Sequence, residues 1–203
     1  MKQLLYILLL LCIACTDSTK KPATITTKKL KPLVDVGVLQ ENKSHTDSLF
    51  KYAGGEEITI YVKEAGKDNL LKVVAKDLPE DIETTFNIFR DNMGHVIRIA
   101  ESPNVETDDE FISCTHYFDE AGRTFAFERK INSFNCHCTN GVLFETKTEY
   151  YDEKFKPLDF TYKLLDENDR HMMKDSCRIV EYQYKVYPNV TTFLKNKSIP
   201  LSN

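Results

Sequence analysis

The residues best suited to chemistry are cysteines and histidines in the second half of the sequence. Cys114 and His116 are two positions apart, so in a β-strand their side chains would leave the same face. A Cys-x-Cys doublet at 136 and 138 brings two more thiols together. Thiolates and imidazoles suit Zn²⁺ or Cu⁺. One hypothesis is therefore a metal site of Cys114, His116, Cys136 and Cys138, and the alternative is a set of disulfides that includes Cys177.

The first fifteen residues, MKQLLYILLLLCIAC, have the three parts of an export signal. Lys2 supplies the positive charge, an apolar run extends from Leu4 to Ile13, and small Ala14 precedes Cys15. The apolar run is roughly half of the ~20 residues that a helix needs to cross a bilayer. We therefore expect a signal peptide rather than a permanent transmembrane helix.

The segment Leu11-Cys12-Ile13-Ala14-Cys15 resembles a bacterial lipobox. The resemblance implies that residues 1–14 are a lipoprotein signal peptide and that Cys15 becomes the N-terminus and carries acyl chains of the palmitate type. It also implies a lipid-anchored protein of the bacterial cell envelope, either periplasmic or surface-exposed. The alternative is an ordinary signal peptide that is cleaved nearby. Residues 15–32 are polar and without a sustained period, which predicts a flexible tether.

Export decides between the two hypotheses for the cysteines, because thiols outside the cytoplasm tend to form disulfides. A bridge between Cys136 and Cys138 would close a strained ring over one residue. We therefore expect Cys114 to pair with one member of that doublet and Cys177 to pair with the other. No metal and no other cofactor is predicted.

Sequence motifs of catalysis are absent from the chain. It contains no Gly-x-Ser-x-Gly, no glycine-rich phosphate loop and no His-Glu-x-x-His. Acidic pairs such as Asp108-Asp109 and Asp152-Glu153 fall in expected turns, whereas acid–base catalysis needs two groups with different environments in a cleft. The 27 basic and 31 acidic residues give a formal charge of −4, with no basic stretch to neutralise phosphates. We predict neither an enzyme nor a nucleic-acid-binding protein.

Residues 33–203 form a single β-rich domain in this interpretation. Apolar and polar side chains alternate with a period of two in the segments 58–62, 111–118, 158–164 and 180–186, which is typical of antiparallel strands. A short helix is expected at 46–53, ended by Gly54-Gly55. The predicted fold is mainly β, an antiparallel meander of hairpins with one or two short helices. A twisted sheet, a sandwich and a half-open barrel all fit this pattern.

A recurring turn supports the meander. In four places an Asp stands three residues before a residue in the position that favours positive φ: Asp91 and Gly94, Asp119 and Gly122, Asp152 and Phe155, Asp166 and Asp169. The unit Phe118-Asp119-x-x-Gly122-Arg123 is similar to the aromatic-Asp-x-x-Gly-Arg turn of YD-type β-repeat proteins, which implies an antiparallel meander.

Three functional hypotheses follow. The leading one is a lipid-anchored envelope protein whose β-rich domain binds or scaffolds, with the membrane and an unidentified envelope protein or ligand as partners. The second is a carrier of a hydrophobic ligand in a half-open β-sheet. The third is an extracytoplasmic metal-binding or thiol-redox protein that uses Cys114, Cys136, Cys138 and Cys177.

Overall fold

The computed structural model describes residues 35–54, 57–73, 78–105, 109–134, 136–177 and 179–200. The chain divides into two units, Met1–Leu33 and Val34–Asn203. The predicted signal peptide, Cys15 and the predicted tether at 15–32 lie outside the described residues. Among the described residues, no helix has both the length and the apolar character that crossing a membrane requires.

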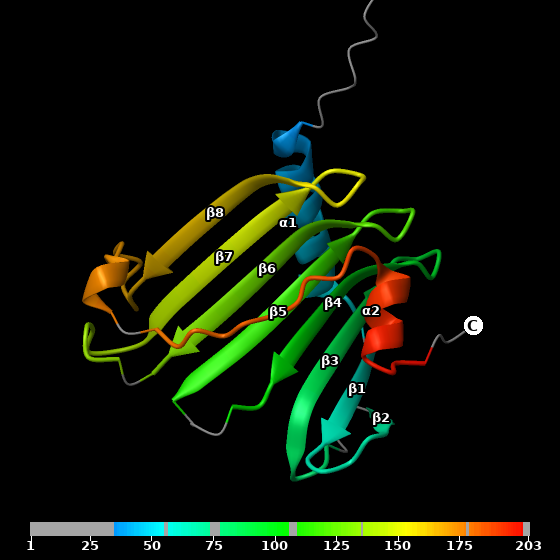
Figure 1. The fold of residues 1–203 in the computed structure, drawn as a ribbon, viewed down its shortest axis with the longest axis horizontal. Coiled ribbons are helices and arrows are strands. Elements are labelled where there is room, and N and C mark those ends of the chain that lie inside the picture. The colour runs from blue at the N-terminus through cyan, green and yellow to red at the C-terminus, as the bar shows by residue number, and fades with distance from the viewer. Residues whose placement is uncertain are drawn as a thin grey trace, which may run out of the picture. The chain divides into compact units, whose positions relative to one another are not determined.

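Eight antiparallel strands form one open sheet in the order β2-β1-β3-β4-β5-β6-β7-β8 (Figure 1). This confirms the predicted β meander, and the sheet does not close into a barrel. The segments expected at 58–62, 111–118 and 158–164 correspond to β1, β5 and β8. The strands are β1 (Ile58–Glu64), β2 (Leu70–Val73), β3 (Ile82–Arg90), β4 (Val96–Pro103), β5 (Glu110–Phe118), β6 (Thr124–Ser133), β7 (Leu143–Tyr151) and β8 (Pro157–Leu165).

The four recurring turns have the predicted geometry. In the turn between β5 and β6, the Asp119 carboxylate accepts hydrogen bonds from the backbone N–H groups of Ala121 and Arg123 at 3.0 and 2.8 Å. Gly122 has a φ of 73°, and Phe155 and Asp169 have positive φ at the equivalent positions. The carboxylate satisfies backbone donors that the strands leave unpaired, which fixes the turn. The turns at Asp91, Asp119 and Asp152 all lie at one end of the sheet, because each joins an odd-numbered strand to the next one.

A C-terminal segment covers one face of the sheet. It begins with the short helix η1 (Lys174–Ser176), continues as an extended strap (residues 179–189) and ends in helix α2 (Val190–Asn196) (Figure 1). The prediction of a β-strand at 180–186 is wrong, because the described strap residues 179–188 do not pair in the sheet. The strap lies across the strands instead, and every second side chain packs against them. That packing produces the same period of two as a real strand.

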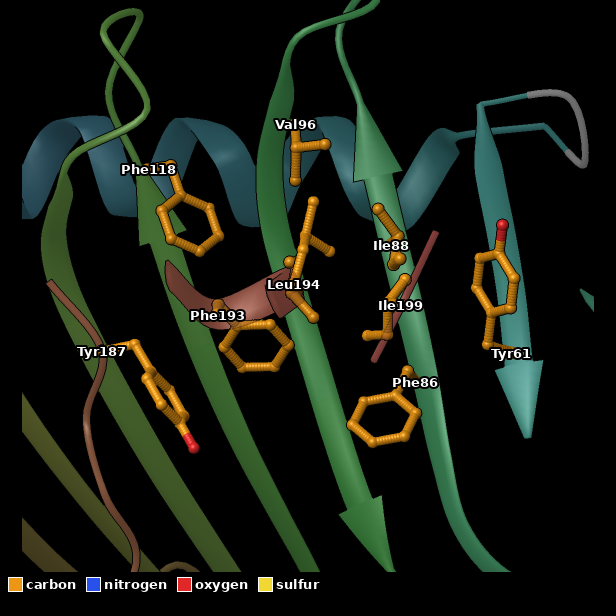
Figure 2. Packing of buried hydrophobic residues seen from close by; sticks show 10 residues of the cluster. Tyr61, Phe86, Ile88, Val96, Phe118, Tyr187, Phe193, Leu194 and Ile199 are labelled. Atoms are coloured by element: carbon orange, nitrogen blue, oxygen red, sulfur yellow. The ribbon is translucent and has the colours of Figure 1, made fainter. Parts of the chain in front are cut away.

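Helix α2 builds the main apolar core on this face. Its Phe193 and Leu194 are almost fully buried against side chains of the sheet such as Phe86, Ile88 and Val96 (Figure 2). The helix begins at Asn189, whose side-chain oxygen accepts a hydrogen bond from the backbone N–H of Thr192 at 2.8 Å. The core therefore joins the C-terminal segment to β1, β3, β4 and β5.

Helix α1 (Val36–Tyr52) lies on the opposite face of the sheet (Figure 1). Asp35 caps its first turn by accepting a hydrogen bond from the N–H of Gly37 at 2.9 Å. The helix therefore begins well before the predicted start at residue 46. The sequence pattern missed the first turns because the side of α1 that contacts the sheet mixes apolar residues with the charged residues Lys43 and Asp47.

Candidate functional site

A groove of about 650 Å³ lies between α1 and the hairpin turns at one end of the sheet. We call it the α1–turn groove. One side is formed by residues of α1 that recur at helical spacing, and the other side is formed by the three turns and the adjoining strand ends. Its apolar lining consists of Leu39, Leu49, Ile97, Phe118, Phe125 and Tyr151.

The charged lining of the groove is predominantly acidic. Five carboxylates and one guanidinium line it: Asp91, Asp119, Glu120, Asp152, Glu153 and Arg123. Arg123 is paired with two of them: a carboxylate oxygen of Asp119 lies 2.8 Å from Nε, and one of Glu153 lies 3.5 Å from a terminal guanidinium nitrogen. One guanidinium cannot balance five carboxylates, so the groove keeps a net negative charge, to which the exposed side chain of Glu120 contributes. Such a surface attracts a ligand that combines apolar groups with positive charge.

A buried ion network holds α1 on the sheet. Lys43 Nζ lies 2.7 Å from a carboxylate oxygen of Glu128 on β6 and 2.8 Å from Asp47 one helical turn away. The Tyr117 hydroxyl of β5 donates to Asp47 at 2.8 Å. Burial alone would raise the pKa of Glu128, but the ammonium groups of Lys43 and Lys130 outweigh it and lower that pKa. The network therefore carries fixed charges at neutral pH and positions one wall of the groove.

Aromatic contacts position the other end of α1. The Arg98 guanidinium of β4 lies over the Phe50 ring at 3.9 Å. Phe50 in turn meets Phe89 of β3 edge-on, with ring centroids 5.5 Å apart. A cation over a ring and an edge-to-face aromatic pair are both favourable arrangements. Helix α1 is therefore fixed at two points along its length, and the groove is a formed feature of the fold.

On the opposite face, the strap is attached by side chains of the sheet. The Tyr187 N–H donates to His116 Nε2 at 3.0 Å, and the Thr124 hydroxyl donates to the Tyr187 carbonyl at 2.7 Å. Arg129 donates to the Tyr182 carbonyl at 2.8 Å. These bonds replace the ladder that a strand would make. His116 is therefore a structural acceptor beneath the strap.

Stability should fall in acid because of His116. Burial, with a smaller contribution from Lys197, lowers the pKa of His116 from 6.5 to about 3. Between these two values the unfolded chain binds a proton that the folded protein excludes, so the free energy of unfolding falls as the pH falls. One such group contributes a slope of up to about 1.4 kcal/mol per pH unit.

Urea unfolding from about pH 7 to about pH 4 measures this slope. We expect His116→Gln to have a shallower pH dependence than the wild type. His95→Gln removes a histidine that is exposed in the β3–β4 turn and serves as the control. Equal slopes for wild type and His116→Gln would show that the buried imidazole is not the group responsible.

The predicted cysteine pairing is half right. Cys138 and Cys177 form a disulfide, with their Cα atoms 5.3 Å apart. Cys114 and Cys136 are free thiols, so the second expected bridge is absent. Cys114 is on β5 and lies opposite Arg129, which is four residues before the end of β6. Cys136 lies in the β6–β7 loop, beyond that end. A strand rises about 3.3 Å per residue, which keeps these two thiols apart.

Burial raises the pKa of the Cys114 thiol to about 12, with Glu101 adding to the effect.

The alternative metal site does not assemble. Within the described residues, no group of three or more histidine, cysteine or acidic side chains is arranged to hold a metal ion. Cys114 and His116 are both fully buried in β5 beneath the C-terminal segment. Cys138 is in the disulfide, and Cys136 lies beside it in the loop. The four proposed ligands therefore occupy two separate places.

Comparison of the chain with family models, with curated proteins and with solved structures finds no match. Its function therefore has to be inferred from the geometry of its own residues. The groove residues that sequence reasoning missed are those in the first turns of α1, such as Leu39 and Asn42, which lie at helical spacing with Thr46 and Leu49. The helical period of this part of the chain is visible only if Lys43 is counted on the buried side.

Proposed function

We propose that this protein is a lipid-anchored binding protein of the bacterial cell envelope. In this proposal the α1–turn groove holds a segment of a partner protein that has apolar and basic side chains. The observation that carries it is the lining of the groove, in which apolar side chains lie beside five carboxylates and a single guanidinium. The anchor part of the proposal rests on the lipobox-like residues 11–15.

The composition of the groove supports a peptide ligand more than a lipid. A carrier for acyl chains needs a largely apolar enclosure, whereas this groove has acidic side chains along the turns. Leu49, which is 43% exposed, offers an apolar contact in the groove. Covering the part that is still exposed contributes about 1 kcal/mol, a little under half of what full burial of an exposed leucine contributes. The carboxylates would then select a partner with lysine or arginine next to its apolar residues.

Binding of a defined probe tests this proposal. The probe is a labelled synthetic peptide of alternating leucine and lysine, followed by fluorescence anisotropy with the mature protein. We expect Leu49→Ser to weaken binding by about tenfold, equivalent to about 1.4 kcal/mol. Val38→Ser is the matched control, because Val38 is an equally exposed residue of α1 that does not line the groove.

Charge reversal tests the acidic lining separately. The double variant Glu120→Lys/Glu153→Lys should lose the peptide, whereas Glu41→Lys/Glu80→Lys changes the net charge equally at exposed positions outside the groove and should keep it. A peptide with glutamate in place of lysine should not bind. Equal binding by both double variants would contradict the proposal. Lipid recovered by organic extraction of the purified protein, with no peptide binding, would favour the hydrophobic-ligand carrier.

A further inference from the structure

The disulfide between Cys138 and Cys177 has a free thiol beside it. Sγ of Cys136 lies 3.8 Å from Sγ of Cys138, which is already bonded to Cys177. Thiol–disulfide exchange begins with attack of a thiolate on one sulfur of the bond. Three sulfur atoms are therefore already next to one another: the nucleophile, the sulfur that it would attack and the sulfur that would leave.

The bond is accessible from one side. A pocket of about 450 Å³ opens over Cys138, and its lining includes the imidazoles of His137 and His171. Cys177 is buried, with 8% of its surface exposed, and packs against Leu143 and Leu164. A thiol from outside would therefore reach the bond at Cys138 and not at Cys177.

We propose that Cys136, Cys138 and Cys177 form a thiol–disulfide exchange site that responds to small or protein-borne thiols. Cys136 gives its proton to solvent, and its thiolate attacks Sγ of Cys138. The Cys136–Cys138 bond forms while the Cys138–Cys177 bond breaks, and Cys177 leaves as a thiolate that takes up a proton. The lone pair of the Cys136 thiolate forms the new bond and the electron pair of the broken bond leaves with Cys177, so the number of disulfides is unchanged and the step needs neither an oxidant nor a reductant.

An external thiolate opens a second route to the same product. It attacks Cys138, releases Cys177 and forms a mixed disulfide with Cys138. Cys136 then attacks Cys138 and expels the external thiol unchanged, so that thiol acts as a catalyst. The ring over one residue in Cys136–Cys138 is strained, so the Cys138–Cys177 form dominates at rest. In the exchanged form the strap loses its covalent tie to the β6–β7 loop, because Cys177 immediately precedes it.

Differential labelling with disulfide mapping tests the proposal. The mature protein is incubated with or without reduced glutathione, quenched in acid, treated with N-ethylmaleimide, digested and mapped by mass spectrometry. In the wild type we expect Cys136–Cys138 peptides together with labelled Cys177. Without glutathione, labelled Cys177 should appear in the wild type at least about tenfold faster than in Cys136→Ser, because only a free Cys136 can then release it. With glutathione, Cys177 is released in both proteins, but the mixed disulfide resolves to Cys136–Cys138 in the wild type and stays on Cys138 in Cys136→Ser.

Cys114→Ser is the matched control, because it removes the other free thiol among the described residues, which is buried under the C-terminal segment. It should behave as the wild type. If Cys136→Ser does not fold, alkylation of Cys136 in the folded wild type blocks the same thiol and should have the same effect. Equal rates of Cys177 labelling in glutathione-free samples with and without a free Cys136, or the absence of any Cys136–Cys138 peptide, would overturn the proposal.

Discussion

Replacing Lys43 with methionine is expected to lower the free energy of unfolding by about 3 kcal/mol. The substitution keeps the length of the side chain but leaves Glu128 and Asp47 without their shared cation. Only 12% of the Lys43 side chain and 7% of the Glu128 side chain are exposed, so water cannot replace the lost partner. Removal of one member of a buried pair is the costly case, because the remaining contacts, Lys130 to Glu128 at 2.9 Å and Arg98 to Asp47 at 3.7 Å, compensate the two carboxylates only in part. Lys130 still pairs with Glu128, so the protein should fold.

Lys63→Met is the matched control for this prediction. Lys63 pairs with Glu83 at 2.6 Å, a distance similar to that of the buried pair, but 34% and 43% of the two side chains are exposed. An exposed pair of this kind contributes less than about 1 kcal/mol. Chemical denaturation measures both variants. Equal losses of stability in the two variants would mean that the buried network does not hold α1 on the sheet.

The Lys43 variant also links stability to binding. Lys43 and Asp47 position α1, and α1 forms one wall of the α1–turn groove. Lys43→Met should therefore weaken the binding of the leucine–lysine peptide as well as lower the free energy of unfolding. Lys43→Met should increase the rate of amide hydrogen exchange, relative to the wild type, more in α1 than in β5 and β6. Lys63→Met should change neither measurement, because Lys63 is on β1 and does not line the groove.

Local chemistry made much of the fold predictable. An Asp whose carboxylate caps two backbone N–H groups needs only the residues of one turn, so the turns at Asp91, Asp119, Asp152 and Asp166 could be found from their spacing. The alternation in residues 111–118 likewise predicted β5. The alternation is typical of a strand with one face in water, but both faces of β5 are covered, since Tyr117 contacts α1 and His116 contacts the strap.

Two elements depended on contacts between distant parts of the chain. The strap alternates as a strand does, but its backbone groups bond to Arg129, His116 and Thr124 instead of to a neighbouring strand. The first half of α1 is stabilised by Glu128 on β6, which no local pattern reveals. The groove combines α1 with turns that follow it by about forty to one hundred residues, so the sequence alone did not predict it.

For the cysteines too, one feature was predictable from the sequence and another depended on contacts between distant parts of the chain. Their number and the expected compartment predicted disulfides, and one formed between Cys138 and Cys177. Their pairing depends on where each strand places its residues. Cys114 points toward the C-terminal segment in mid-sheet, where the loop that carries Cys136 cannot reach it.

Replacing Cys15 with alanine is expected to abolish lipid attachment, the largest effect predicted for any single substitution. One acyl chain contributes about 0.8 kcal/mol for each buried CH₂ group and binds a membrane only reversibly, whereas two or three chains hold firmly. With no acylated residue, the chain should lose the anchor that we propose. Cys12→Ala is the matched control, because it removes the cysteine within the predicted signal peptide and should leave lipidation unchanged.

The direct measurement is the mass of the N-terminal peptide from the full chain, expressed in a bacterium that processes lipoproteins and separated into membrane and soluble fractions. We predict that the wild type and Cys12→Ala are in the membrane fraction, with a first residue Cys15 that carries acyl chains. Cys15→Ala should lack them. A wild-type chain recovered from the cytosol with Met1 to Ala14 still attached and no lipid on Cys15 would contradict the account.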